Sequence, residues 1–159
     1  MAYRVFLSHS TRDQGLVIAL AHLLTKLEVQ VYVAEWHLTP GEPLAKKVLA
    51  EIRKSDCVVA LLTRDGARSS WVHQEIGYSL EQGKLVIPIV EKGVSRKSLG
   101  ALQGREIVEY DPNDYQETLI RLAHYVKASK LKKEEREKAL LVVGGLLVAF
   151  LLLAAGSQE

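Results

Sequence analysis

Short runs of apolar, mostly β-branched residues alternate along this chain with segments whose apolar residues recur every three or four positions. The runs occupy residues 3–7, 29–34, 57–62, 85–90 and 107–110. Runs of this kind favour strands, and a period of three to four favours amphipathic helices. Strands that alternate with helices are typical of a parallel sheet covered on both faces. The sequence therefore predicts an α/β fold with a doubly wound, five-stranded parallel sheet, complete by about residue 127.

The helix predicted after the third run carries an aromatic ring and a carboxylate at helical spacing. Its apolar residues Val72, Ile76 and Leu80 recur every four positions, which indicates a face that packs on the sheet. Trp71 and Glu75 are also four residues apart, so they share an adjoining stripe of the helix. Loops at the carboxyl ends of parallel strands diverge and leave a crevice where ligands bind. We expect Trp71 and Glu75 to lie beside that crevice.

The C-terminal part of the chain is strongly apolar. Residues 139–155 are seventeen consecutive residues without a charged or strongly polar side chain. As a helix this run is ~25 Å long, a little short of a ~30 Å hydrocarbon core, and snorkelling by Lys138 could close the difference. We expect a transmembrane helix here. The alternative is that the run packs inside an oligomer.

The charged segment before the apolar run predicts the orientation of the chain in a membrane. Residues 127–138 carry six basic and three acidic side chains. Basic residues concentrate on the cytoplasmic side of membrane spans. We therefore expect a single-pass, C-terminal anchor in a lipid membrane, with the N-terminal domain in the cytoplasm. The expected parts are a domain over 1–127, a charged juxtamembrane segment over 128–138, the transmembrane helix over 139–156 and a tail over 157–159.

Charge and cysteine content make some functions improbable for the N-terminal domain. The net charge of the whole chain is +2, of which residues 127–138 contribute +3 and Glu159 contributes −1, so residues 1–126 are neutral. Domains that bind nucleic acid usually have a strongly basic face, so we expect no nucleic-acid partner. The single cysteine, Cys57, fits a reducing compartment. No histidine has metal-ligand spacing with Cys57, so we expect no metal site.

Four sequence motifs follow one another in a distinctive order. They are Phe6-Leu-Ser-His-Ser with Asp13 beyond it, Glu35-Trp36 with Pro40-Gly41, Ser69-x-Trp71-x-x-x-Glu75, and Leu85-Val-Ile-Pro-Ile-Val90. Together they resemble the Toll/interleukin receptor (TIR) domain family over roughly residues 3–127. The Trp-x-x-x-Glu motif resembles prokaryotic-type members of that family. The order of four motifs is more specific than any one of them.

The resemblance implies a flavodoxin-like fold and, where a glutamate stands at the position of Glu75, cleavage of NAD+ between nicotinamide and ribose. NAD+ would then be a substrate, and no cofactor is expected. One catalytic carboxylate could suffice, because nicotinamide leaves as a neutral ring from a cationic pyridinium. Glu75 could stabilise the oxocarbenium-like transition state or act as a nucleophile. Trp71 and Trp36 could stack on rings of the substrate, and Ser8 and His9 could hydrogen-bond its ribose or phosphate.

Each of these assignments has a simpler alternative. Glu75 could be a solvated helix residue, Trp71 a core anchor, Trp36 a contact for a partner protein, and His9 a residue that closes a turn. Many TIR domains only assemble with one another, so a non-enzymatic scaffold that self-associates or recruits other TIR domains stays open. A nucleoside hydrolase or base-exchange enzyme is a third possibility, because the same carboxylate chemistry handles other N-glycosides.

Overall fold

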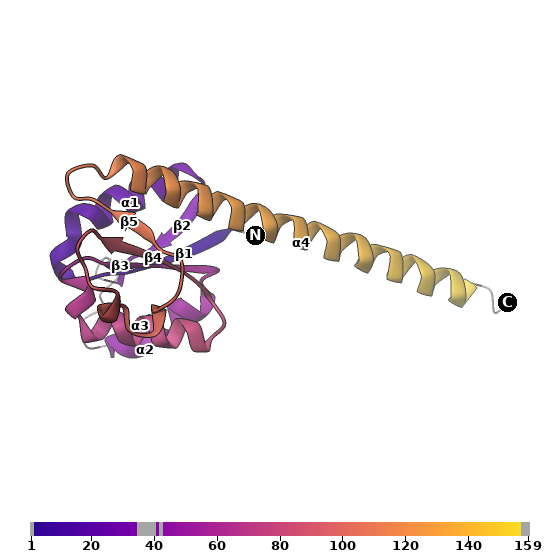
Figure 1. Ribbon diagram of the computed structural model, residues 1–159. Coiled ribbons are helices and arrows are strands. Elements are labelled where there is room, and N and C mark those ends of the chain that lie inside the picture. Colours follow the sequence, from indigo (N-terminus) through magenta and orange to yellow (C-terminus); the bar gives the residue numbers. More distant parts are fainter. Residues whose placement is uncertain (1, 35–40, 42, 157–159) are drawn as a thin grey trace.

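The computed structural model describes residues 2–34, 41 and 43–156. Within these ranges the strands and α-helices are, in order, β1 (Tyr3–Ser8), α1 (Gln14–Lys26), β2 (Val29–Tyr32), α2 (Leu44–Lys54), β3 (Cys57–Leu62), α3 (Ser70–Glu81), β4 (Leu85–Glu91), β5 (Val108–Tyr110) and α4 (Gln116–Gly156) (Figure 1). The described residues also include 3₁₀ helices at Thr11–Asp13, Gly66–Arg68 and Arg96–Leu102. The predicted alternation of strands and helices is confirmed.

The strands form one parallel sheet in the order β2-β1-β3-β4-β5. The chain moves outward from β1 to β2 and then returns to β3 on the other side of β1. That reversal makes a topological switch point between β1 and β3, and in open α/β sheets ligands bind at the carboxyl ends of the strands near such a point. The register pairs Ser8 with Ala60 and Ala60 with Pro88, so the carboxyl ends of the three central strands lie at one edge.

Helices cover both faces of the sheet, with α1 and α4 on one side and α2 and α3 on the other (Figure 1). Successive side chains of a strand point to opposite faces, so each strand contributes to two cores. Val5 and Leu7 pack in the core under α1 and α4. Phe6 packs in the second core, together with Val72 and Ile76 of α3. Both faces of β1 are therefore buried, which fixes its position in the sheet.

The predicted strand limits differ from the structure mainly at the two edges of the sheet. The second strand ends at Tyr32 instead of residue 34, and the fifth begins at Val108 instead of residue 107. An edge strand has one hydrogen-bonded neighbour, and β5 pairs with only the last three residues of β4. The polar connection after β4 also contains a 3₁₀ helix, which buries Leu99 and Leu102.

Helix α4 is a single helix of 41 residues, ~62 Å long, that begins on the sheet and extends well beyond the domain (Figure 1). Its first turns bury Thr118, Leu122 and Val126 against the domain. Residues 138–156 are exposed. By length and composition the helix could cross a membrane. The last helix of the domain, the charged segment and the apolar run thus form one continuous helix.

Removal of a buried side chain from α4 should loosen the helix from the domain. Leu122 is fully buried, so Leu122→Ala should lower the free energy of unfolding by about 3 kcal/mol through lost burial and the cavity left behind. Ile120 lies on the same helix and is 68% exposed, so Ile120→Ala should change it by less than about 0.5 kcal/mol. Urea unfolding of the full chain in neutral detergent measures both values. Equal losses for the two variants would contradict the docking of α4 described here.

Candidate active site

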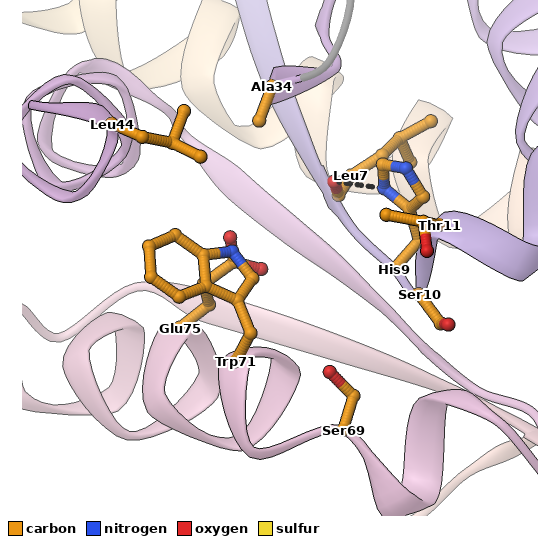
Figure 2. Close-up of a pocket in the computed structure, with 9 residues that line it drawn as sticks. All are labelled: Leu7, His9, Ser10, Thr11, Ala34, Leu44, Ser69, Trp71 and Glu75. Carbon is orange, nitrogen blue, oxygen red and sulfur yellow. Dashed lines mark hydrogen bonds between the residues drawn. The ribbon is translucent and has the colours of Figure 1, made fainter. Parts of the chain in front are cut away.

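A cavity of about 360 Å³ opens at the carboxyl edge of the sheet, beside β1. Its walls come from β1 and the residues that follow it, from the end of the β2 segment and from the first turns of α2 and α3 (Figure 2). The lining residues are Leu7, His9, Ser10, Thr11, Ala34, Leu44, Ser69, Trp71 and Glu75. Both predicted residues of α3, Trp71 and Glu75, thus line one cavity. The volume lies within the usual range for small-molecule sites.

Local sequence explains how α3 presents Glu75 to this cavity. The Ser69 hydroxyl accepts a hydrogen bond from the amide of Val72 at 3.3 Å and caps the first turn of the helix. Val72 and Ile76 are buried in the core below the helix. Glu75 lies between them in sequence, so its side chain is carried on the neighbouring stripe, toward β1. Only 4% of Glu75 is exposed, although it lines the cavity.

Two hydrogen bonds hold the Glu75 carboxyl group. The Ser8 hydroxyl, at the end of β1, donates one to a carboxylate oxygen. The indole N–H of Trp71 donates the other, and Figure 2 shows the indole nitrogen beside the carboxyl oxygens. Burial raises the pKa of Glu75 from 4.5 to about 7, and the hydrogen bonds from Ser8 and then Trp71 oppose that rise. A carboxyl group with a pKa near neutrality can exist in either protonation state in the cell.

Ser8 lies at the end of β1, as predicted, but other elements pack over its side chain. It is fully buried, and in the described part of the chain it is not among the residues that line the cavity. Its hydroxyl contacts the Glu75 carboxylate instead. The sequence predicts Ser8 as a substrate contact because it stands at the tip of a strand. The burial of a strand end depends on the elements packed over it, which the local sequence does not reveal. The direct partner of Ser8 is thus a side chain of α3.

The positions of His9 and Trp71 are compatible with a contact to a ligand and also with the structural roles that were the alternatives. His9 lines the cavity, and its Nδ1–H donates to the backbone carbonyl of Leu7 at 3.1 Å (Figure 2). That bond orients the ring. Trp71 also lines the cavity and packs against the core under α3. Anchoring of the helix and contact with a ligand are therefore compatible roles for Trp71.

Other lining residues were missed from the sequence. Ala34 and Leu44 add apolar side chains to the cavity wall, and Ser10 and Thr11 add hydroxyl groups. Leu7 also borders the cavity, although its side chain packs in the core under α1 and α4. Pro43 directly precedes α2 and favours the start of a helix, but nothing in the local pattern indicates that the first turn of α2 reaches the cavity beside β1. Trp36 lies outside the described residues, so its proposed contact with a substrate stays a prediction.

A second hydrogen-bonded group supports the loops around the cavity. The Thr63 hydroxyl, just after β3, donates to the Asp13 carboxylate at 2.7 Å and accepts from the amide of Gly66 at 2.9 Å. Burial raises the pKa of Asp13, and the bond from Thr63 opposes this. The 3₁₀ helix Thr11–Asp13, which begins at a lining residue of the cavity, is thereby tied to the loop that leads into α3.

A site for a metal ion was not expected from the sequence. In residues 2–34, 41 and 43–156 no group of three or more histidine, cysteine, aspartate or glutamate side chains could hold one. The sole cysteine, Cys57, is buried in β3, where burial raises its pKa to about 12. The polar side chains that line the cavity are the Glu75 carboxyl group, the His9 ring, the Trp71 indole and the hydroxyls of Ser10, Thr11 and Ser69.

The fold and the cavity together define a flavodoxin-like α/β domain with a ligand cavity at the carboxyl edge of its sheet. A family model described as "TIR domain" matches residues 5–123, and the chain belongs to that family. The fold agrees: the TIR domain of the Toll-related receptor TRR-2 from Hydra magnipapillata superposes with a TM-score of 0.62 at 18% identity, over 77% of this chain and 99% of that one.

Two curated relatives are bacterial. The "2' cyclic ADP-D-ribose synthase AbTIR" of Acinetobacter baumannii (strain 1295743) is 26% identical over 116 residues, which are 70% of this chain and 40% of the relative. The "Putative cyclic ADP-D-ribose synthase TIR2" of Cytobacillus dafuensis is 28% identical over 96 residues, 55% of this chain and 25% of the relative. The matched region thus spans less than half of each relative's length.

The raised pKa of Glu75 should make the stability of the domain depend on pH. The pKa of Glu75 rises from its ordinary value of 4.5 in the unfolded chain to about 7 in the fold, so folding favours the protonated form. That stabilisation is complete below about pH 4.5 and is lost as pH rises through 7. Relative to Glu75→Gln, which stays neutral, the free energy of unfolding of the wild type should fall by about 3 kcal/mol over this window. Urea unfolding from pH 4.5 to 8 tests this, and parallel curves for the two proteins would contradict it.

Proposed function

We propose that this chain is a membrane-anchored TIR domain that cleaves NAD+ at the bond between nicotinamide and ribose, with Glu75 as the catalytic carboxylate. The observation that carries the proposal is the Glu75 carboxyl group itself, buried in the wall of a ligand-sized cavity and held by Ser8 and Trp71. The two bacterial relatives support it, because they are named as synthases of cyclic ADP-ribose. Release of nicotinamide from NAD+ leaves the ADP-ribose unit that such a product contains.

The chemistry requires little besides a well-placed negative charge. In NAD+ the nicotinamide ring is a cationic pyridinium. When the glycosidic C–N bond breaks, its electron pair leaves with the ring, and nicotinamide departs neutral without a proton. Positive charge then develops on the ribose, and an ionised Glu75 would stabilise it. Addition of water gives linear ADP-ribose, and addition of a group from the same molecule gives a cyclic product.

The pKa of Glu75 suits this role once a cationic substrate is present. Without substrate, burial holds the pKa at about 7. A positive charge within a few ångströms favours the ionised carboxylate and lowers the pKa. The substrate would therefore generate the charged form that the reaction needs. Ser8 and Trp71 would keep the two carboxylate oxygens in a fixed orientation during this change.

The remaining substrate contacts follow from the lining of the cavity. Trp71 offers an aromatic face, and His9 with the neighbouring hydroxyls can hydrogen-bond ribose or phosphate oxygens. We propose Trp36 as a second stacking surface. Ala34 and Leu44, which are described residues on either side of Trp36 in the sequence, both line the cavity. Ser8 acts on the substrate through Glu75.

We further propose that residues 139–156 anchor the domain in a membrane, with the domain in the cytoplasm. The support is the length and composition of α4, its exposed apolar side chains and the basic segment just before them. Anchoring confines copies of the chain to one surface, which raises their effective concentration. Self-association, or assembly with other TIR domains, would then need no additional affinity.

Replacement of the proposed catalytic carboxylate should abolish the reaction. Glu75→Ala should reduce the rate of nicotinamide release from NAD+ by about 100-fold or more, because the developing positive charge loses its partner. Glu81→Ala removes an exposed carboxylate from the same helix and should leave the rate unchanged. The assay uses the full chain in lipid vesicles and in detergent, and measures nicotinamide by chromatography.

Three outcomes of that assay would overturn the proposal in different ways. If Glu75→Ala releases nicotinamide as fast as the wild type, Glu75 is not the catalytic carboxylate. No release by the wild type in either setting favours a non-enzymatic TIR scaffold. Faster cleavage of free nucleosides than of NAD+ favours the nucleoside hydrolase.

The hydrogen bond from Ser8 should be visible in the pH dependence of the reaction. It stabilises the ionised form of Glu75, so Ser8→Ala should raise the pKa of that group further and move the acidic limb of the kcat/KM profile to higher pH. Ser79→Ala is the matched control. The Ser79 hydroxyl is also buried and also bonds to Glu75, but it donates to the backbone carbonyl at 2.6 Å. A shift of equal size in both variants would show a general effect on packing.

A further inference from the structure

A second cavity, of about 370 Å³, lies at the amino edge of the sheet, opposite the candidate active site. Tyr3 and Leu85, which begin β1 and β4, line one side of it. Helix α4 lines the other side through Ser129 and three basic residues. The Lys133 ammonium on α4 donates to the Ala2 carbonyl, so the start of β1 lies beside α4 where that helix leaves the domain (Figure 1). The cavity is therefore formed where the domain and the emerging helix meet.

The lining of this cavity is strongly basic. Four of its side chains are cationic, namely Lys84, Lys132, Lys133 and Arg136, and one is anionic, namely Asp56. Asp56 is already paired, because the Lys133 ammonium lies 3.0 Å from its carboxylate. Three positive charges thus remain without a matching carboxylate in the lining. Such a cavity has the electrostatics of an anion site.

Two of the cations are free to bind a ligand. Lys132 and Arg136 are exposed and lie four residues apart, so they stand on the same side of α4. Within the part of the chain that the structure describes, neither forms a hydrogen bond or ion pair with another protein group. The other two have fixed roles: Lys133 donates to the Ala2 carbonyl at 3.1 Å, and Lys84 donates to the Arg53 carbonyl at 2.6 Å. Lys133 and Lys84 thus shape the cavity, and Lys132 and Arg136 supply the positive charges that can bind a ligand.

The position along α4 sets the distance between this cavity and the bilayer. Arg136 precedes the apolar run at Ala139 by three residues and Lys132 precedes it by seven, which is ~5 Å and ~10 Å along a helix. The headgroup layer on each side of the hydrocarbon core is about 5–8 Å thick. With the apolar run inserted, Arg136 would lie within the headgroup layer. The backbone of Lys132 would lie a few ångströms beyond that layer, and its flexible four-carbon side chain can span the difference.

We propose that this cavity binds the phosphate of an anionic phospholipid headgroup from the leaflet that α4 enters. The inference rests on the membrane anchoring proposed above. Lys132 and Arg136 would contact the phosphate, and Ser129 and Gln82 add neutral polar groups for headgroup hydroxyls. The bound lipid would join α4 to the amino edge of the sheet. The candidate active site, at the carboxyl edge, would then face away from the bilayer.

The test uses the full chain and first establishes that it is anchored. Flotation with vesicles of neutral phosphatidylcholine reports insertion independently of headgroup charge. A chain that does not float fails the anchoring proposal itself. Nicotinamide release, measured on the same samples, reports the catalytic proposal separately.

The decisive measurement compares the Tm of the domain in nanodiscs of pure phosphatidylcholine with that in discs containing one fifth phosphatidylglycerol. A ligand that binds only the folded domain stabilises it, so the anionic lipid should raise Tm by about 4 °C. The double variant Lys132→Gln/Arg136→Gln should lose this increase. Lys127→Gln/Lys138→Gln removes the same charge from exposed positions of α4 outside the cavity and should keep it. Circular dichroism in pure phosphatidylcholine verifies that both double variants are folded.

Three results would overturn the proposal. An equal Tm in both kinds of disc shows that no anionic lipid is bound. An equal loss of the Tm increase in the two double variants shows that anionic lipid attracts the basic residues of α4 in general, without a specific site. The control variant can detect this because Lys138 is nearer to the apolar run than Arg136. An equal increase from inorganic phosphate added to the neutral discs shows a site for a free anion in place of a lipid.

Discussion

Glu75 places a carboxyl group between strand β1 and helix α3, where water is largely excluded. Removing a carboxylate from water costs several kcal/mol unless polar partners replace the lost hydration. Here the partners are the Ser8 hydroxyl and the Trp71 indole. One belongs to the strand and the other to the helix, so the same two hydrogen bonds position the carboxyl group and join two walls of the cavity. The geometry of the site is therefore inseparable from the packing of α3 on the sheet.

The loop between β3 and α3 is constrained as tightly as the helix it precedes. A side chain at Gly66 would place its Cβ only 2.0 Å from the backbone carbonyl oxygen of Leu61, so the turn requires glycine. The amide of Gly66 also bonds to Thr63, which in turn holds Asp13. This network sets where Ser69 can cap α3. The position of Glu75 thus depends on a turn that makes no contact with its carboxyl group.

The sequence predicted the elements of the fold well and the environment of single side chains less well. The period of Val72 and Ile76 identified the buried face of α3, and the spacing of Trp71 and Glu75 placed them on one stripe. Helical period does not report how closely another element approaches that stripe. The burial of Glu75 and its bond with Ser8, 67 positions earlier, depend on that approach. For the same reason, the sequence did not predict that Leu44 lines the candidate active site. Nor did it predict that Lys133 pairs with Asp56 in the second cavity.

Helix α4 connects the domain to the proposed membrane anchor without a flexible joint. It is helical from Gln116 to Gly156, and its contacts with the domain extend from Thr118 to Lys133, where the ammonium group reaches Asp56 at 3.0 Å. A helix transmits tilt and rotation along its axis, whereas a flexible linker would lose both. If the apolar run pairs with a second copy in the bilayer, Gly145 and Ala149 offer a small-residue spacing for close approach. Such pairing would then bring two domains together in a defined relative orientation, with both candidate active sites at the edge farthest from the membrane.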